Sequence, residues 1–88
     1  MATWTEPKSV DAAIEAFAEG YAFTHGRLHS DGRTLLSYGL AIAQRTATVK
    51  VLNENLAVKP NGERSQTTVR HIRKVLRECP GAKVVDAL

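Results

Sequence analysis

The chain has 88 residues, of which 43% are hydrophobic and 24% charged, and its formal net charge is +3. This size and composition predict one globular domain over residues 1–88 and exclude a large enclosed active site. The single cysteine, Cys79, excludes an intramolecular disulfide and the paired-cysteine motifs of zinc ribbons and redox proteins. No apolar stretch reaches the ~18 residues that a membrane span needs. We therefore expect a cytoplasmic protein without membrane association.

The first predicted element is a helix over residues 9–20. Ser9 can accept a hydrogen bond from the first free amides, apolar residues recur at helical spacing as far as Phe17, and Gly20 suits the C-terminal stop. Three carboxylates recur at intervals of four, at Asp11, Glu15 and Glu19. They form either a solvated face or a docking surface for a basic partner. Residues 1–20 carry a charge of −3 and residues 21–88 carry +6, an asymmetry typical of proteins that meet polyanions.

From residue 21 to residue 53 the apolar period changes to two, which predicts strands over 21–30, 33–45 and 48–52. Asp31-Gly32 favours a tight hairpin between the first two. In the second strand the large side chains, on the face expected to pack against the helices, are Leu36, Tyr38, Leu40 and Ile42. The opposite face carries the small residues Ser37, Gly39, Ala41 and Ala43, and could admit another chain, a loop or a ligand.

Residues 53–64 contain Pro60-Asn61-Gly62 and are predicted to form an exposed loop. The last helix follows, opened by the polar cluster from Ser65 to Thr68 and closed by Pro80-Gly81. Residues 1–8 and 81–88 are predicted tails, the second of which either adds a short edge strand or stays loose. The resulting fold class is α+β, in the order αβββα: an N-terminal helix, a three-stranded antiparallel β-meander and a C-terminal basic amphipathic helix.

The last helix separates apolar residues from cations at helical spacing. Guanidinium and ammonium groups on one face can bind phosphates or carboxylates, and hydroxyl and amide groups can add hydrogen bonds. The predicted partner-binding or phosphate-binding residues are Arg64, Gln66, Thr67, Arg70, Arg73, Lys74 and Arg77. Glu78 alone opposes these cations along the helix, and no aromatic residue is interleaved with them. The competing interpretation is an ordinary solvated face whose long cations cover the apolar edges.

No motif indicates catalysis or metal binding. His25 and His29 lie on a predicted strand, where a rise of ~3.3 Å per residue separates their Cα atoms by roughly 13 Å, which favours two surface histidines near a turn over a shared metal site. Cys79 is expected in the core, and neither a Gly-x-Ser-x-Gly elbow nor a glycine-rich phosphate loop is present. We expect no enzyme activity, no cofactor, no metal and no small-molecule substrate.

Three motifs carry a resemblance to a known group: Ser30-Asp31-Gly32, Leu36-Ser37-Tyr38-Gly39-x-Ala41-Ile42-Ala43, and Ser65-x-Thr67-Thr68-x-Arg70-His71. Over about residues 10–77 the chain resembles small uncharacterised proteins carried by bacteriophages and other mobile elements. It departs from them at Leu40, where the group more often has Thr, and at Arg64-Ser65, where it has Tyr-Ser. The group has no established activity. The resemblance implies a bacterial host cell, a last helix beside the central strand, and a polar cluster of Ser37, Tyr38, Thr67, Thr68 and His71.

Two functions follow as hypotheses. The first is a non-catalytic binding protein whose basic helix engages an acidic partner, either a nucleic acid or a host nucleoprotein assembly. The alternative is a protein-directed inhibitor of a host defence complex, of the anti-CRISPR type. Such an inhibitor would dock through the small-residue sheet face, the 53–64 loop or the acidic first helix.

Overall fold

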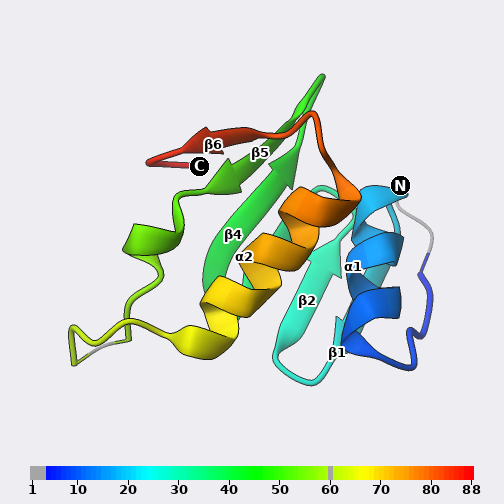
Figure 1. Ribbon diagram of the computed structural model, residues 1–88. Coiled ribbons are helices and arrows are strands. Elements are labelled where there is room, and N and C mark those ends of the chain that lie inside the picture. Colours follow the sequence, from blue (N-terminus) through cyan, green and yellow to red (C-terminus); the bar gives the residue numbers. More distant parts are fainter. Residues whose placement is uncertain (1–3, 60) are drawn as a thin grey trace.

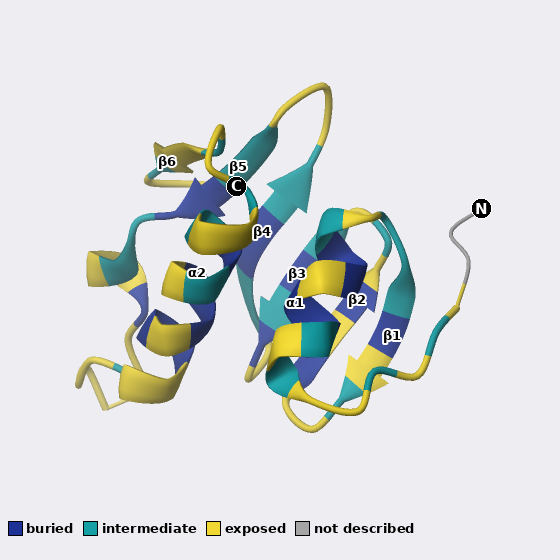
Figure 2. Cartoon of the chain, turned by 45° about the vertical axis from the view of Figure 1, so that its right-hand side comes forward, coloured by how far each residue is buried: buried dark blue, intermediate teal, exposed yellow. Residues whose placement is uncertain are grey.

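The fold has two layers, with both helices on one face of a single sheet (Figure 1, Figure 2). A computed structural model describes residues 4–59 and 61–88. The elements in chain order are α1 (Val10–Ala18), β1 (Ala22–His25), β2 (Leu28–Asp31), β3 (Thr34–Ser37), β4 (Leu40–Arg45), β5 (Val49–Leu52), the short 3-10 helix η1 (Glu54–Leu56), α2 (Gln66–Glu78) and β6 (Lys83–Val85). The predicted α+β class is confirmed. The predicted three-stranded meander is wrong, because the sheet has six strands.

The six strands lie across the sheet in sequence order, from β1 to β6. β1 to β5 form an antiparallel meander, whereas β6 pairs in parallel with β5. The parallel pair requires a crossover, which α2 provides between these two strands. The predicted order αβββα is therefore corrected to αβββββαβ, with a mixed sheet.

Two unpredicted hairpins account for most of the extra strands. The predicted strand 21–30 turns back at Gly26 and Arg27, and the predicted strand 33–45 turns back at Tyr38 and Gly39. Tyr38 and Gly39 have φ angles of 52° and 82°, the pair of left-handed residues that a type I′ turn requires. Gly26, with a φ of 57°, takes the first central position of its own two-residue turn, where glycine is favoured.

The faces predicted for the central segment are also wrong. Leu35 and Ser37 are fully buried beneath the helices, whereas Tyr38 lies in the turn and is 58% exposed. A shift in register beside Leu35 produces a bulge, so that the consecutive residues Ile42 and Ala43 are both fully buried. The continuous small-residue face that could have received a partner therefore does not exist.

Both helices lie where the sequence predicts them. The Ser9 hydroxyl caps α1 by accepting from the N–H of Ala12 at 3.1 Å, and the Ser65 hydroxyl caps α2 by accepting from the N–H of Thr68 at 3.3 Å. Apolar side chains from both helices and five strands fill the space between the layers (Figure 2). The largest fully buried ones are Ile14, Phe17, Phe23, Leu28, Leu35, Ile42, Val51, Ile72 and Val75.

The segments outside the predicted elements also take part in the fold. Residues 53–64, the predicted exposed loop, contain η1 and the fully buried Ala57. Residues 81–88 supply β6, and Trp4 forms a parallel bridge at the start of β1, while residues 1–3 of the other predicted tail lie outside the described ranges. Within those ranges, no helix is both long enough and apolar enough to cross a membrane.

The left-handed conformation of Gly39 predicts a specific loss of stability. Gly39→Ala places a Cβ at a φ of 82°, which costs about 1–2 kcal/mol for an L-residue, and we expect the free energy of unfolding in urea to fall by that amount. Gly81→Ala is the matched control, because an added Cβ has open space at both positions and Gly81 has no positive φ. Equal losses in the two variants would contradict this account of the turn.

Candidate functional site

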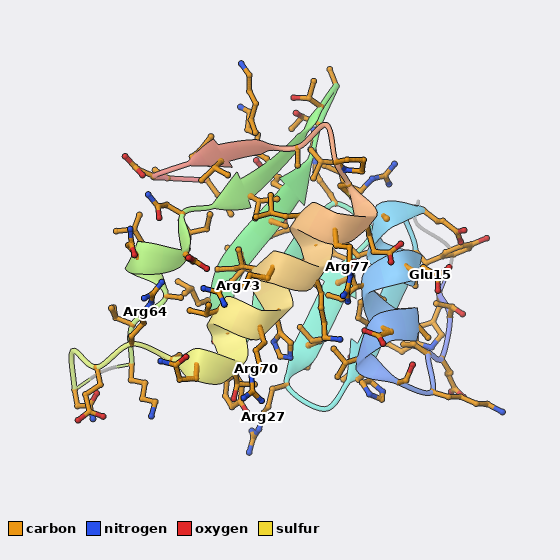
Figure 3. All side chains as sticks on the ribbon, in the orientation of Figure 1. Glu15, Arg27, Arg64, Arg70, Arg73 and Arg77 are labelled. Carbon is orange, nitrogen blue, oxygen red and sulfur yellow. The ribbon has the colours of Figure 1, made fainter. Side chains whose placement is uncertain are left out.

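The candidate site is the outer side of α2, together with the segments that lie against it (Figure 3). The helix is amphipathic, so Val69, Ile72 and Val75 are buried against the sheet while the cations lie on the other side. Six of the predicted binding residues are exposed and one is half-buried: Arg64, Gln66, Thr67, Arg70, Arg73 and Arg77 are exposed, and Lys74 is half-buried. The helix therefore presents these residues to solvent as predicted, but their ionic partners were not predicted.

One carboxylate, Glu54 of η1, lies between two of the predicted arginines. The Arg73 guanidinium donates from Nε to Glu54 Oε2 at 2.8 Å and from Nη2 to Oε1 at 3.3 Å, a two-pronged contact. Arg64 Nη2 lies 3.3 Å from the same Glu54 Oε1. The hydrogen bond from Arg73 is the main reason that the pKa of Glu54 is lowered, and the same contact raises the pKa of Arg73.

The other two cations of the helix turn toward α1. Lys74 Nζ donates to Asp11 Oδ1, and Arg77 Nη2 lies 3.9 Å from the same oxygen. The hydrogen bond from Lys74 is the largest cause of the lowered pKa of Asp11. Figure 3 shows Arg77 on the side of α2 that faces α1, the helix that carries Glu15. The C-terminal half of the basic side therefore helps to join the two helices.

These contacts correct the prediction that Glu78 alone opposes the cations. Glu54 and Asp11 together contact four of them, which leaves two positive charges unbalanced. Arg70 forms no ion pair with any carboxylate of the described residues. The basic side is therefore neutralised only in part by the chain itself. Ion pairs this accessible to solvent contribute little free energy.

Beneath the first turns of α2, three of the residues suggested by the resemblance meet in a buried polar cluster. The Ser37 hydroxyl of β3 lies 2.8 Å from His71 Nδ1 and 3.3 Å from Thr68 Oγ1. The Ser65 hydroxyl donates to Thr68 Oγ1 at 2.9 Å. Ser37 is fully buried, and Thr68 and His71 are 2% and 7% exposed. The cluster fixes α2 against β3 through polar groups that all have partners.

The hydrogen bonds of this cluster hold α2 against β3. A serine beside a histidine is the start of a nucleophilic arrangement; Ser37 is fully buried, and it is among the residues that line a pocket beside Tyr38. Burial is the main cause of the lowered pKa of His71, and the nearby Lys74 charge lowers it further. A neutral imidazole can accept a hydrogen bond from Ser37, which keeps the charge out of the core.

Tyr38, the neighbour of Ser37, lies outside the cluster and beside Arg27. Its N–H donates to the Arg27 carbonyl oxygen at 3.0 Å, and the Arg27 guanidinium carbon lies 5.8 Å from the centre of its ring. They meet because the β1–β2 and β3–β4 hairpins turn at the same end of the sheet. Figure 3 shows Arg27 and Arg70 projecting at this end, near the start of α2.

A pocket of about 520 Å³ opens between Tyr38 and the first turn of α2. Its wall includes the side chains of Val58, Lys59, Ser65 and Thr67. Polar and apolar groups therefore lie together in one hollow at the edge of the basic side. Of the seven predicted binding residues, Thr67 is the one that lines this pocket in the described structure, while Gln66 occupies the first, exposed position of the helix.

Sequence reasoning missed Arg27 and the outward role of Tyr38. The available signal was the two glycine dipeptides, Gly26-Arg27 and Tyr38-Gly39, each of which suits a tight hairpin turn. In an antiparallel meander, the first and third hairpins turn at the same end of the sheet, so Arg27 and Tyr38 would have been expected to meet there. Tyrosine is atypical in such a turn, where Asn or Asp usually precedes glycine. The pattern therefore indicated a continuous strand instead.

Comparisons with protein-family models, curated proteins and solved structures found no match to this chain. The resemblance to phage and mobile-element proteins therefore stays a prediction. Within residues 4–59 and 61–88, no group of three or more His, Cys, Asp or Glu side chains could hold a metal ion. Cys79 is half-buried, and burial is the main cause of its raised thiol pKa. The surface chemistry of the site is therefore that of cations, hydroxyl groups and one aromatic ring.

The buried imidazole predicts that stability falls on mild acidification. In the unfolded chain His71 titrates near its ordinary pKa of 6.5, whereas burial lowers its pKa in the folded protein. Between these two values only the unfolded state takes up the proton, so the free energy of unfolding decreases as the pH falls below about 6.5. Urea unfolding measured between about pH 7.5 and pH 5 should show this slope, and His71→Gln should flatten it. An identical pH dependence in the two proteins would refute the assignment.

Proposed function

We propose that this protein is a non-catalytic binding protein that engages a nucleic acid, or a nucleoprotein assembly of a bacterial host, through the basic side of α2. The observation that carries the proposal is the state of Arg70. It is exposed and has no carboxylate partner among the described residues, and it lies on the same helix side as Arg73. Arg64 and Arg73 both pair with Glu54, whose single negative charge balances only one of the two positive charges.

The existing ion pairs support such a binding mode rather than oppose it. The Glu54 carboxylate holds Arg64 and Arg73 in a geometry suited to an oxyanion, because a phosphate offers the same acceptor oxygens with more charge. Glu54 is half-buried and partly solvated, so replacing its carboxylate by a phosphate exchanges one partly solvated contact for another. Counterion release from the nucleic acid then supplies the net driving force.

The cellular setting of the proposal rests on the resemblance. Small proteins of phages and mobile elements act inside a bacterial cell, where nucleic acids and their protein assemblies are abundant anionic partners. The part-neutralised cationic side, with its exposed Arg70, supports a binding role. No cofactor or small-molecule substrate forms part of the proposal.

A second candidate function is a protein-directed inhibitor of a host defence complex, of the anti-CRISPR type. The observation that favours it is the apolar surface of the segment 53–64, where Leu56 and Val58 are 41% and 51% exposed. Exposed apolar side chains rimmed by polar ones are typical of protein-binding surfaces. A partner held mainly by these apolar side chains would depend little on charge, so we expect its affinity to be less sensitive to reversal of Arg70 than that of a nucleic acid.

Charge reversal at one position separates these functions. With a DNA duplex of ~20 base pairs at ~50 mM salt, we expect Arg70→Glu to weaken binding about tenfold, measured by fluorescence anisotropy. For about four phosphate contacts, the slope of log affinity against log salt should be roughly −3 to −4 for the wild-type protein. Arg70→Glu removes one of these contacts, so the slope of the variant should be less steep by about one.

Arg33→Glu is the matched control for that experiment. It makes the same change in net charge at an exposed residue of the β2–β3 hairpin, at the opposite end of the sheet from Arg27. We expect its affinity to change by less than about threefold, because only the long-range field changes. Absence of binding at ~50 mM salt, or equal losses in the two variants, would reject the proposal.

Removing the shared carboxylate should strengthen binding. Glu54→Gln releases Arg64 and Arg73 from their ion pairs, so we expect the affinity for the same duplex to rise several-fold. Glu63→Gln is the control, since it removes the same charge from the same segment, where Glu63 is exposed and has no ion pair within the described residues. A gain no larger than that of the control would show that the released arginines do not contact the nucleic acid.

A further inference from the structure

The basic side alone does not account for the exposed ring of Tyr38. This side chain is 58% exposed, the largest value among the exposed large hydrophobic residues of the described chain. It is positioned by the I′ turn, with its N–H bonded to Arg27, so its backbone is fixed while its ring meets solvent. A rigid aromatic ring with two rotatable bonds offers contact area at a low entropic cost.

The turn itself gives no reason for a tyrosine at this position. A φ of 52° is unfavourable for a bulky side chain, and Asn or Asp before Gly39 would form the same turn with less strain. The ring adds nothing to the core. Residues held in unfavourable backbone conformations are concentrated at binding sites. We therefore expect the exposed Tyr38 ring to contribute to binding rather than to folding.

The surroundings of the ring are cationic and polar. The Arg27 guanidinium lies over the ring, 5.8 Å from its centre. Lys59 and Thr67 line the adjoining pocket of about 520 Å³, a volume within the range of ~300–1,000 Å³ usual for small-ligand sites. Arg70 follows Thr67 by three residues, so it projects from the same side of α2. An aromatic ring among cations is the combination that binds a base and its phosphates.

We propose that the nucleic-acid partner is single-stranded, with an unpaired base stacked on Tyr38 and the flanking phosphates bound by Arg27 and Arg70. This inference rests on the proposed function and specifies its ligand. In a duplex each base is covered by its neighbours, so only an unstacked base can offer its face to the ring. An acidic protein surface would satisfy the arginines without requiring the ring, whereas an unpaired base uses both.

The test uses a fluorescein-labelled oligothymidylate of about ten nucleotides and a labelled duplex of about ten base pairs. We expect the wild-type protein to bind the single strand more tightly than the duplex. Tyr38→Asn should weaken single-strand binding by between ~5-fold and ~150-fold. Its duplex affinity should stay within about twofold, because the phosphate contacts persist.

Two controls keep the test decisive. Tyr38→Phe retains the ring and should bind the single strand within about threefold of wild type. Tyr38→Asn suits the I′ turn, so its melting temperature should equal or exceed that of wild type, and a loss of binding cannot be assigned to unfolding.

The outcomes separate this inference from the function on which it rests. If both ligands bind but Tyr38→Asn leaves single-strand affinity unchanged, the stacking role is wrong while the anionic partner stands. A preference for duplex, or an equal loss on both ligands, also overturns the single-strand assignment. If neither oligonucleotide binds, the proposed function itself fails, and a protein partner takes its place.

Discussion

The tight turn at Tyr38 and Gly39 is the constraint on which the arrangement of the site depends. Because both residues have left-handed backbone conformations, Ser37 pairs directly with Leu40 and the register of β3 against β4 is fixed. Ser37 then points into the core, where it meets His71 of α2. The next residue, Tyr38, is directed outward. One two-residue turn thus determines both how the last helix is attached and which ring stands beside the cations.

The electrostatic design of the surface follows from a shortage of carboxylates. Each of Glu54 and Asp11 is shared by two cations, so these four cations remain incompletely balanced, while the pKa of each of the two carboxylates is lowered. A shared carboxylate orients the cationic groups that contact it, but it does not neutralise their combined positive charge. The side of α2 that packs on the sheet, by contrast, is uncharged: Val69, Ile72 and Val75 join the core, and hydroxyl and imidazole groups add hydrogen bonds.

Both helices could be predicted because their signals are local: a serine cap, apolar residues at helical spacing, and a glycine or proline at the end. The strand at 49–52 and the hairpin at Asp31-Gly32 could be predicted too. The faces and the further turn of the central segment could not, since adjacent Leu35 and Leu36 allow either face to be the buried one and Tyr38 is atypical of a turn. The cations of the site follow from helical spacing, but their partners do not. Glu54 is 19 residues from Arg73 and Asp11 is 63 from Lys74, so only the folded topology brings them together.

The three-residue strand β6 has a further consequence for how the molecule behaves in a crowded solution. It covers the outer backbone of β5, and the Asn53 N–H donates to the Val85 carbonyl at 2.8 Å where the two strands end. β5 carries the buried Val51 and Leu52, and without this cover its unpaired amides and carbonyls would offer a template for another chain. A short strand that carries Lys83 and the exposed Val84 is a poor template in its place. This edge of the sheet is thereby less open to pairing with another chain.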